Sequence, residues 1–326
     1  MKVKKESPIL NWVKRHKHEF GAYCGLLFCI VLFSVVPPLR GKSIWEAEKL
    51  ATLMSNVIVN SLLSVGAVFV YAMGNMDVSI GKQVGLYATL IVALGNATGS
   101  LLPGILVSLV IAIIIGAANG AIGELLHIHP VVSSVAFMMA LSGVSTVTYN
   151  ALGSRNVGLK TIDYHLFKEP WLMVVALVVE IIIITYLFNY TKYGKNAKAI
   201  GANPVAAQQS GINLVKFKVI SYVIMGFCVV LASLFQMGFT GSASDSTGTG
   251  FEMNVMVALI LGGMPLNGGM RSKVSCAVVG SFTLGLLAVG LPLIGVKANQ
   301  VFIIKAVIFL IVVLITCRKK DGTLPR

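Results

Sequence analysis

Long apolar runs separated by short polar segments make up most of this chain. Ten runs stand out, at residues 20–37, 55–73, 83–96, 101–122, 130–150, 170–188, 215–239, 252–263, 274–294 and 300–317. Most have the roughly 17 to 25 residues that a helix needs to cross about 30 Å of hydrocarbon. Because the runs are continuous rather than alternating, they favour helices over barrel strands. The third and eighth are short, which indicates helices that stop partway or re-enter the membrane. We therefore predict an all-α polytopic membrane protein with about ten transmembrane helices, some of them short or broken.

Composition supports this prediction and narrows the choice of partners. The 326 residues are 56% hydrophobic and 12% charged, with a mean hydropathy of +0.86, whereas a soluble domain has about 25% charged residues. The net charge of +14 would suit nucleic-acid binding, but Lys and Arg also accumulate in the cytoplasmic loops of membrane proteins. No soluble segment interleaves basic and aromatic residues, so we expect the lipid bilayer, and no nucleic acid, as a partner. The five cysteines lack metal-ligand spacing, and we expect no metal site.

The distribution of basic residues predicts the orientation of the helices. With ten spans and a cytoplasmic N-terminus, 18 Lys and Arg residues fall in cytoplasmic segments and 7 in outside segments, as the positive-inside rule requires. Both termini are therefore expected in the cytoplasm. The chain then divides into a basic cytoplasmic segment at 1–19, a single transmembrane domain at 20–317 and a cytoplasmic tail at 318–326. In this arrangement the loop at 189–214 faces the cytoplasm.

A polar island at 193–213 lies between two of the apolar runs. Asn203 can act as an N-cap, and Pro204 suits the first helical position, where no backbone donor is needed. Residues 205–210 can form a short helix, and Gly211 suits the left-handed residue that ends it. We predict a capped helix of about two turns at the membrane surface, a form suited to contact with another protein.

Two glycine-containing segments share their spacing. Residues 73–81 and 261–269 each follow one apolar run and precede another, and they carry Gly74, Gly81, Gly262, Gly263, Gly268 and Gly269. Glycine permits tight turns and close approach of the backbone. Broken helices at corresponding places in two halves of a transporter indicate its binding path. Two unrelated glycine-rich turns explain the pattern equally well, so both interpretations stay open.

Several motifs together resemble one family. Residues 74–81 (GNMDVSIG) resemble a Gly-Gly-Ile-Asp-Leu-Ser-Val-Gly motif, and residues 261–269 (LGGMPLNGG) resemble Ile-Gly-Gly-x-x-Leu-x-Gly-Gly. Asn119-Gly120 resembles an Asn-Gly element, and residues 191–212 resemble a segment that contains Gly-x-Asn-x-x-Ala-Ala-x-x-Ser-Gly-Ile. These are motifs of the permease subunits of ABC importers of the ribose, xylose and galactoside type, a group distantly related to branched-chain amino acid permeases. The resemblance runs from about residue 56 to 316. The chain departs from the family pattern at Asn75, Lys195 and Met264-Pro265, which bears on the substrate or on a non-identical partner permease more than on the fold.

The resemblance implies the membrane subunit of an ATP-driven importer for a monosaccharide or related small polar solute, in the plasma membrane of a prokaryote. The chain has no G-x-x-x-x-G-K-[ST] phosphate loop, the usual cradle for nucleotide phosphates. We therefore expect no enzyme activity and no cofactor, with ATP bound by separate ATP-binding cassette subunits. The loop at 189–214 is then the coupling loop. The residues expected to couple to the ATPase are Lys195, Asn203, Pro204, Val205, Ala206, Ala207, Gln208, Gln209, Ser210 and Gly211. The resemblance further implies an extracytoplasmic solute-binding protein and either a second copy of this permease or a related one.

A neutral sugar needs hydrogen-bonding side chains along its path rather than strong charge. The candidates by position and chemistry are Asn56, Asn60, Ser64, Asp77, Ser133, Ser134, Asn254 and Asn267. For Asp77, the competing structural interpretation is capping of the helix that follows it.

Two charges inside apolar runs keep other classes of transporter open. Glu180 lies near the middle of the sixth run and Lys305 lies in the tenth. They can form a structural pair, whereas an ion-coupled secondary transporter would use them to move ions. A channel would need only the pore. Neither alternative gives a reason for the capped cytoplasmic helix.

Overall fold

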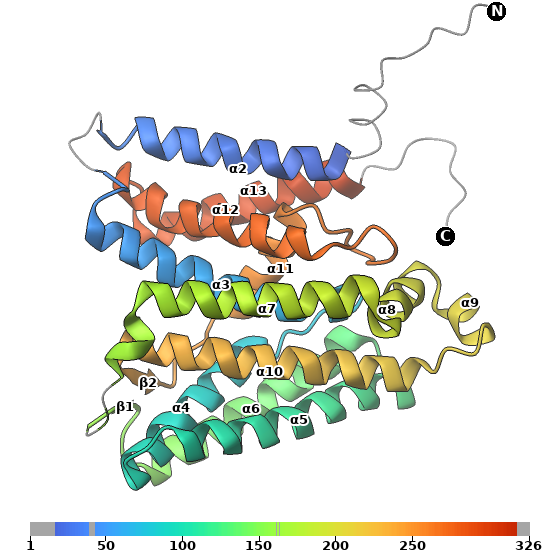
Figure 1. Ribbon diagram of the computed structural model, residues 1–326, viewed down its shortest axis with the longest axis horizontal. Helices are drawn as coiled ribbons and strands as arrows, with labels where there is room; N and C mark the ends of the chain where they lie inside the picture. The colour runs from blue at the N-terminus through green and yellow to red at the C-terminus, as the bar shows by residue number, and fades with distance from the viewer. Residues whose placement is uncertain (1–16, 39–42, 161, 163, 318–326) are drawn as a thin grey trace, which may run out of the picture.

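The computed structural model describes residues 17–38, 43–160, 162 and 164–317. Most of the basic segment predicted at 1–19, and the tail at 318–326, therefore lie outside the described residues. Helices make up 78% of the structure. They are α2 Lys17–Val35, α3 Ala47–Ala72, α4 Ile80–Thr98, α5 Leu102–Leu125, α6 Pro130–Ala151, the 3-10 helix η2 His165–Lys168, α7 Pro170–Tyr190, α8 Lys192–Ala202, α9 Pro204–Gln209, α10 Leu214–Thr240, α11 Phe251–Leu261, α12 Val274–Leu293 and α13 Ala298–Cys317 (Figure 1). Two short strands, β1 Asn156–Gly158 and β2 Ser242–Ser244, pair antiparallel with Val157 opposite Ala243.

Each of the ten apolar runs found in the sequence falls on one of these helices. Within the described residues, six helices are long and apolar enough to cross a membrane: α3, α5, α6, α7, α10 and α12. The prediction of a helical polytopic membrane protein is confirmed at this level. Most of the long helices run side by side, with α8 and α9 at one end of the bundle and the β1–β2 sheet at the other (Figure 1).

Burial separates central helices from peripheral ones. The apolar window of α3 is 89% buried, and α10 and α12 also bury most of theirs, whereas α5, α6 and α7 bury at most a third. Helix α3 packs against α7, α10, α11 and α12, and α5 packs against α4 and α10. The outer helices expose large apolar side chains such as Val147, Ile182 and Leu106, which suits contact with lipid acyl chains.

Small residues set the distance between α5 and α10. A Cβ atom at Gly116 would lie 2.9 Å from the backbone oxygen of Tyr222, and one at Gly120 would lie 2.7 Å from the Cα atom of Val219. Ala112, one turn before Gly116, lies against Gly226 of α10. Such stripes of small residues let membrane helices approach closely, where van der Waals packing holds them together.

Several local predictions need correction. The third run, expected to be a short helix, is α4, whose 19 residues span about 28 Å at 1.5 Å per residue. The second run begins earlier than expected, because residues 47–54 are the first turns of α3. Helix α8 and the β1–β2 sheet were not predicted, and the sheet departs from a purely all-α fold. Three-residue strands are too short to show an alternating pattern in the sequence. Helix α8 does have a helical pattern, because its buried residues Gly194, Ala197 and Ile200 recur every third position.

Candidate functional site

Helix α9 is the capped helix predicted in the polar island. The Asn203 Oδ1 atom accepts a hydrogen bond from the Ala206 backbone N–H at 3.1 Å, and Pro204 occupies the first helical turn. At the other end Gly211 has φ +82°. Its N–H donates to the Gln208 carbonyl at 2.9 Å, and the Ile212 N–H donates to the Ala207 carbonyl at 3.1 Å. This pair of bonds is a Schellman motif, which satisfies the carbonyls at a helix C-terminus. Six residues are therefore held helical by caps at both ends.

Helix α9 projects from the bundle rather than packing into it (Figure 1). Ala207 is its one buried residue, and the Val205 side chain is 63% exposed. Isolated helices of this length are unstable in water, so the caps and the attachment to α8 keep it formed. An exposed, preformed helix with an apolar side chain on its surface is suited to insertion into a groove on another protein.

Helix α8 connects α9 to the centre of the bundle. Its Gly194 lies directly against the Phe188 backbone at the end of α7. Its Gly201 lies directly against the backbone carbonyl of Ala72, the last residue of α3. Glycine at both points lets backbone meet backbone without an intervening side chain. Helix α8 is therefore in direct backbone contact with the ends of α7 and α3.

The two glycine-containing turns meet at the same place. Gly74, with φ +77°, is so close to the Asn267 carbonyl that a Cβ atom would lie 2.9 Å from it. The Gly269 N–H donates to the Ala72 carbonyl at 2.7 Å, and Gly268 lies against the same carbonyl. We call this contact of residues 72–74, 267–269 and Gly201 the glycine junction. Of the other glycines noted in the sequence, Gly81 lies against Glu252 and Gly262 against Cys276, whereas Gly263 is a turn residue with φ +92°.

A buried polar cluster follows the first glycine turn. Asp77 is 1% exposed, and its Oδ1 atom accepts hydrogen bonds from the Ser79 N–H at 2.7 Å and the Ser79 hydroxyl at 2.6 Å. Its Oδ2 atom accepts from the Asn119 amide at 3.3 Å and the Gln83 amide at 3.4 Å. The Ser133 hydroxyl donates to Asn119 Oδ1 at 3.3 Å. The hydrogen bonds to both carboxylate oxygens offset part of the cost of burying the charge of Asp77.

Asp77 organises the start of α4 without capping its first turn. The bond from the Ser79 N–H to Asp77 is a local side-chain turn just before the helix, and Ser79, at the N-cap position, forms no side-chain cap bond. Ser134 lies on the far side of the turn, where its hydroxyl accepts from the Val78 N–H at 3.2 Å. Sequence reasoning proposed Asp77, Ser133 and Ser134 separately, and the structure brings them together. It missed Ser79 and Gln83, although their i+2 and i+6 spacing from Asp77 was a usable signal.

Three further path candidates follow one face of α3. Asn56, Asn60 and Ser64 are spaced four residues apart, and Ser64 accepts a hydrogen bond at 3.2 Å from the Ser281 hydroxyl of α12. The Asn60 amide donates to the Asn56 carbonyl at 2.7 Å, but the buried Asn60 Oδ1 has no hydrogen-bond partner among the described residues. A buried acceptor without a donor lowers the stability of the fold, and it can still accept a hydrogen bond from another molecule. Asn254 lies half-buried on α11, and Asn267 is exposed at the glycine junction. The eight residues proposed for the sugar path therefore form separate groups rather than one site.

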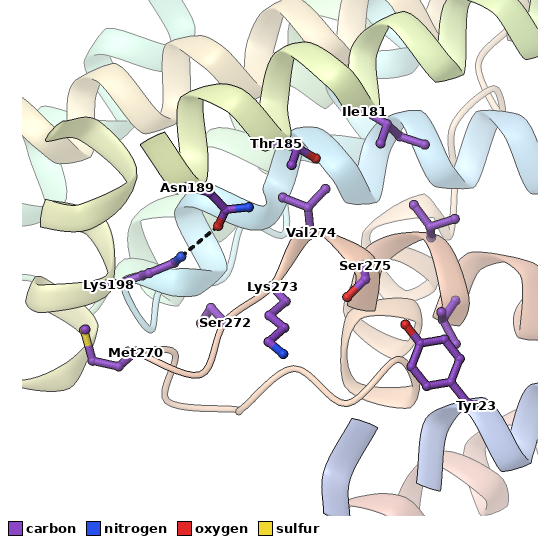
Figure 2. Close-up of a pocket in the computed structure, with 12 residues that line it drawn as sticks. Tyr23, Ile181, Thr185, Asn189, Lys198, Met270, Ser272, Lys273, Val274 and Ser275 are labelled. Atoms are coloured by element: carbon purple, nitrogen blue, oxygen red, sulfur yellow. Dashed lines mark hydrogen bonds between the residues drawn. The ribbon is translucent and has the colours of Figure 1, made fainter. Parts of the chain in front are cut away.

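Two cavities lie at opposite ends of α12. One, of about 560 Å³, surrounds its first turns and is lined by Tyr23, Ile181, Thr185, Asn189, Lys198, Met270, Ser272, Lys273, Val274, Ser275, Val278 and Val279 (Figure 2). The other, of about 710 Å³, adjoins its last turns and the start of α3, and is lined by Glu46, Lys49, Thr52, Asn56, Ala288, Val289, Pro292 and Leu293. The second cavity reaches Asn56, the first of the three polar residues Asn56, Asn60 and Ser64, which we call the α3 stripe.

The structural pair considered for Glu180 and Lys305 is not formed. Glu180 lies on α7, which packs against α3 and α12, whereas Lys305 lies on α13, which packs against α11 and α12. Glu180 is 5% exposed, and the side-chain partner of its carboxylate among the described residues is the Cys228 thiol of α10, a weak donor. The only ion pairs found between described residues join Lys218 to Glu124 and Lys49 to Glu48. Hydropathy and spacing along the sequence do not show which way a side chain on one helix faces relative to another helix.

The sequence is similar to known proteins over nearly its whole length. A family model described as the permease component of the branched-chain amino acid transport system matches residues 49–313. The chain is 27% identical over 307 residues to the ribose import permease protein RbsC of Escherichia coli (strain K12), which covers 90% of this chain and 93% of that protein. It is 26% identical over 335 residues to the galactose/methyl galactoside import permease protein MglC of Salmonella typhimurium (strain LT2), covering 96% and 97%. It is 28% identical over 264 residues to the L-arabinose transport system permease protein AraH of Escherichia coli (strain K12), covering 79% of each chain.

Proposed function

We propose that this chain, which belongs to the family of permease components of the branched-chain amino acid transport system, is the membrane subunit of an ATP-driven importer for a monosaccharide or a related small polar solute. The observation that carries the proposal is the extent of the match. Residues 49–313 include the α3 stripe, the glycine junction, the Asp77 cluster and α9. The similar permeases are named for import of ribose, galactosides and arabinose, which supports a sugar-sized polar substrate here.

The proposal includes ten membrane spans with both termini in the cytoplasm of a prokaryote. The excess of basic residues in the assigned cytoplasmic segments supports this orientation. So does the arrangement of the bundle, in which the start of α2, the end of α13 and α9 lie at one end (Figure 1). Reporter fusions after Leu152 and after Ser210 test it: the first is expected outside and the second inside. The reverse result at either position would overturn the orientation.

In this proposal α9 is the contact through which a separate ATPase moves the permease. The helix enters a groove on the ATP-binding cassette subunit, and α8 transmits its displacement to the glycine junction. From there the movement reaches α3 and the Asp77 cluster, whose turn begins directly after the junction. Rigid displacement of packed elements about such contacts is a common way of alternating access.

The proposed sugar path runs between α3 and α12. It begins at the cavity beside Asn56 and continues along Asn60 to Ser64 and Ser281. The free Oδ1 acceptor of Asn60 supports this assignment, because sugar hydroxyls donate hydrogen bonds. Asn60 and Ser64 are buried, which fits a path that opens only during the transport cycle. An extracytoplasmic solute-binding protein delivers the sugar, and a second permease, identical or related, completes the transporter.

The coupling role is tested by replacing residues 205–209 with Gly and Ser in the tagged chain and measuring how much ATPase co-purifies. We expect the ATPase to be lost while the permease remains folded. A control replaces Thr98 and Ser100, which are exposed beyond the opposite end of the bundle, and should retain the ATPase. Transport that persists without ATP but collapses with the proton gradient would refute the importer assignment and favour the ion-coupled alternative.

A further inference from the structure

The cavity at the start of α12 has a charge and polarity that the transport mechanism does not use. Two lysines line it, Lys198 from α8 and Lys273 from the residue before α12 (Figure 2). The twelve described residues that line it include no Asp or Glu. The Lys198 ammonium donates to Asn189 Oδ1 at 3.1 Å and lies 4.2 Å from the centre of the Phe188 ring. Both contacts hold the ammonium in place without neutralising its charge.

The surroundings of Lys198 disfavour its positive charge. Burial, and then the positive charge of Lys273, lower the pKa of the Lys198 ammonium below its usual value. Two like charges at the rim of one cavity repel each other, and an anion between them would relieve that repulsion. The two ammonium groups therefore favour an anion as a ligand of this cavity.

The backbone adds a second attraction for anions. Helix α12 has 20 residues, and its N-cap residue Lys273 forms no side-chain cap hydrogen bond. Val274 and Ser275, in the first turn of α12, line the cavity. The N–H groups at a helix N-terminus and the helix dipole both favour negative charge. The cavity thus receives the positive end of a long helix in addition to two side-chain ammonium groups.

An unpartnered hydroxyl provides an independent indication of a ligand. Ser272 is 1% exposed and lines the cavity, yet its Oγ atom has no hydrogen-bond partner among the residues that the structure describes. Leaving a buried hydroxyl unpaired costs about 1–3 kcal/mol, so such atoms in folded proteins usually indicate a missing partner. An acceptor oxygen in the cavity would supply one.

We propose that this cavity is a binding site for a phosphate-type anion, held by Lys198, Lys273, Ser272 and the N-terminus of α12. The lining also indicates the source of the phosphate. Toward the bundle interior the wall becomes apolar, with Ile181, Val278 and Val279 one to two turns farther in than Asn189 and Ser275. A phospholipid matches both parts, because its headgroup would meet the lysines while an acyl chain follows the apolar wall. Anionic lipids are known to bind basic pockets between membrane helices on the cytoplasmic side.

Native mass spectrometry of the purified transporter, titrated with phosphatidylglycerol, phosphatidylcholine or inorganic phosphate, tests the site. Phosphatidylglycerol should bind more tightly than phosphatidylcholine. Each of Lys198→Gln and Lys273→Gln should weaken phosphatidylglycerol binding about tenfold, the effect of losing one charged hydrogen bond. Ser272→Ala, which removes only one oxygen atom and leaves the fold intact, should weaken it several-fold. The matched control is Lys216→Gln, because Lys216 is exposed near the same end of the bundle and does not line the cavity.

The arms of the experiment distinguish the sources of the anion and can refute the site. Binding of phosphatidylglycerol but not of inorganic phosphate supports a lipid headgroup, and equal binding of both supports a free phosphate. If Lys198→Gln and Lys216→Gln bind phosphatidylglycerol like the unaltered chain, the lipid is merely annular and the site is refuted. Loss of the ATPase from Lys198→Gln with unchanged lipid binding would instead assign the cavity to a protein contact.

Discussion

The Asp77 cluster supports a quantitative prediction, because one substitution changes its hydrogen bonds without changing its shape. Asp77→Asn keeps the acceptor that faces Ser79 but places an NH₂ group where Oδ2 accepts from Asn119 at 3.3 Å and Gln83 at 3.4 Å. Gln83 retains a second partner, because its amide also donates to the Ser79 hydroxyl at 2.8 Å. Within the described residues the Asn119 amide donates only to Asp77, so it is the donor left facing another donor.

The cost of Asp77→Asn follows from this count. One buried donor without a partner costs about 1–3 kcal/mol, and the loss of charge assistance in the two bonds from Ser79 adds about 1 kcal/mol. We therefore expect a loss of about 2–4 kcal/mol. Asn119→Asp alone should cost more, because two carboxylates would face each other in a buried site. The exchange Asp77→Asn with Asn119→Asp restores a donor opposite an acceptor, and the carboxylate introduced at position 119 can still accept from Ser133.

A double-mutant cycle measures this pairing directly. The assay is the temperature at which half of the purified protein remains monodisperse in size-exclusion chromatography, in one detergent for all variants. The expected order of stability is the unaltered chain, the exchange variant, Asp77→Asn and then Asn119→Asp. The reasoning is refuted if the exchange variant is no more stable than the sum of the two single losses predicts, or if Asp77→Asn is as stable as the unaltered chain.

Three further predictions concern α9, the α5–α10 contact and Glu180. Asn203→Ala and Gly211→Ala should each destabilise α9 by about 1 kcal/mol and reduce the amount of ATPase that co-purifies. At Gly211 the cause is backbone strain alone, because no described atom lies within 4 Å of an added Cβ. Gly116→Leu should abolish monodisperse protein, because its Cβ already lies 2.9 Å from the Tyr222 oxygen, whereas Gly143→Leu, which meets no described atom within 4 Å, should be tolerated. Glu180→Gln should retain both stability and ATP-dependent transport, since the Gln carbonyl can still accept from the Cys228 thiol, the side-chain partner of the carboxylate; transport assays in proteoliposomes would contradict this if the variant were inactive.

The sequence predicted what depends on local chemistry. Each apolar run became a helix, and Asn203, Pro204 and Gly211 predicted α9 because capping involves atoms only a few residues apart. It could not predict which helix faces which, since period and hydropathy do not fix the rotation of one helix against another. Whether Glu180 and Lys305 form a pair was open for this reason. The contact between the two glycine turns was open for the same reason, because shared spacing does not place two segments next to each other.

In the proposed mechanism, the glycine junction connects a small helix at the surface to a path in the interior. Between α8 and α3 the contact is made by backbone atoms, because Gly201 touches Ala72 and the Gly269 N–H donates to the same carbonyl. Side chains can absorb a displacement by changing rotamer, whereas backbone in direct contact cannot. Movement of α9 is therefore passed on to α3, the helix that carries Asn56, Asn60 and Ser64. The same movement reaches residues 73–79, where the bonds around Asp77 tie the turn to α5 and α6. The element proposed to contact an ATPase and the elements that line the proposed path are thus joined by a short, stiff connection.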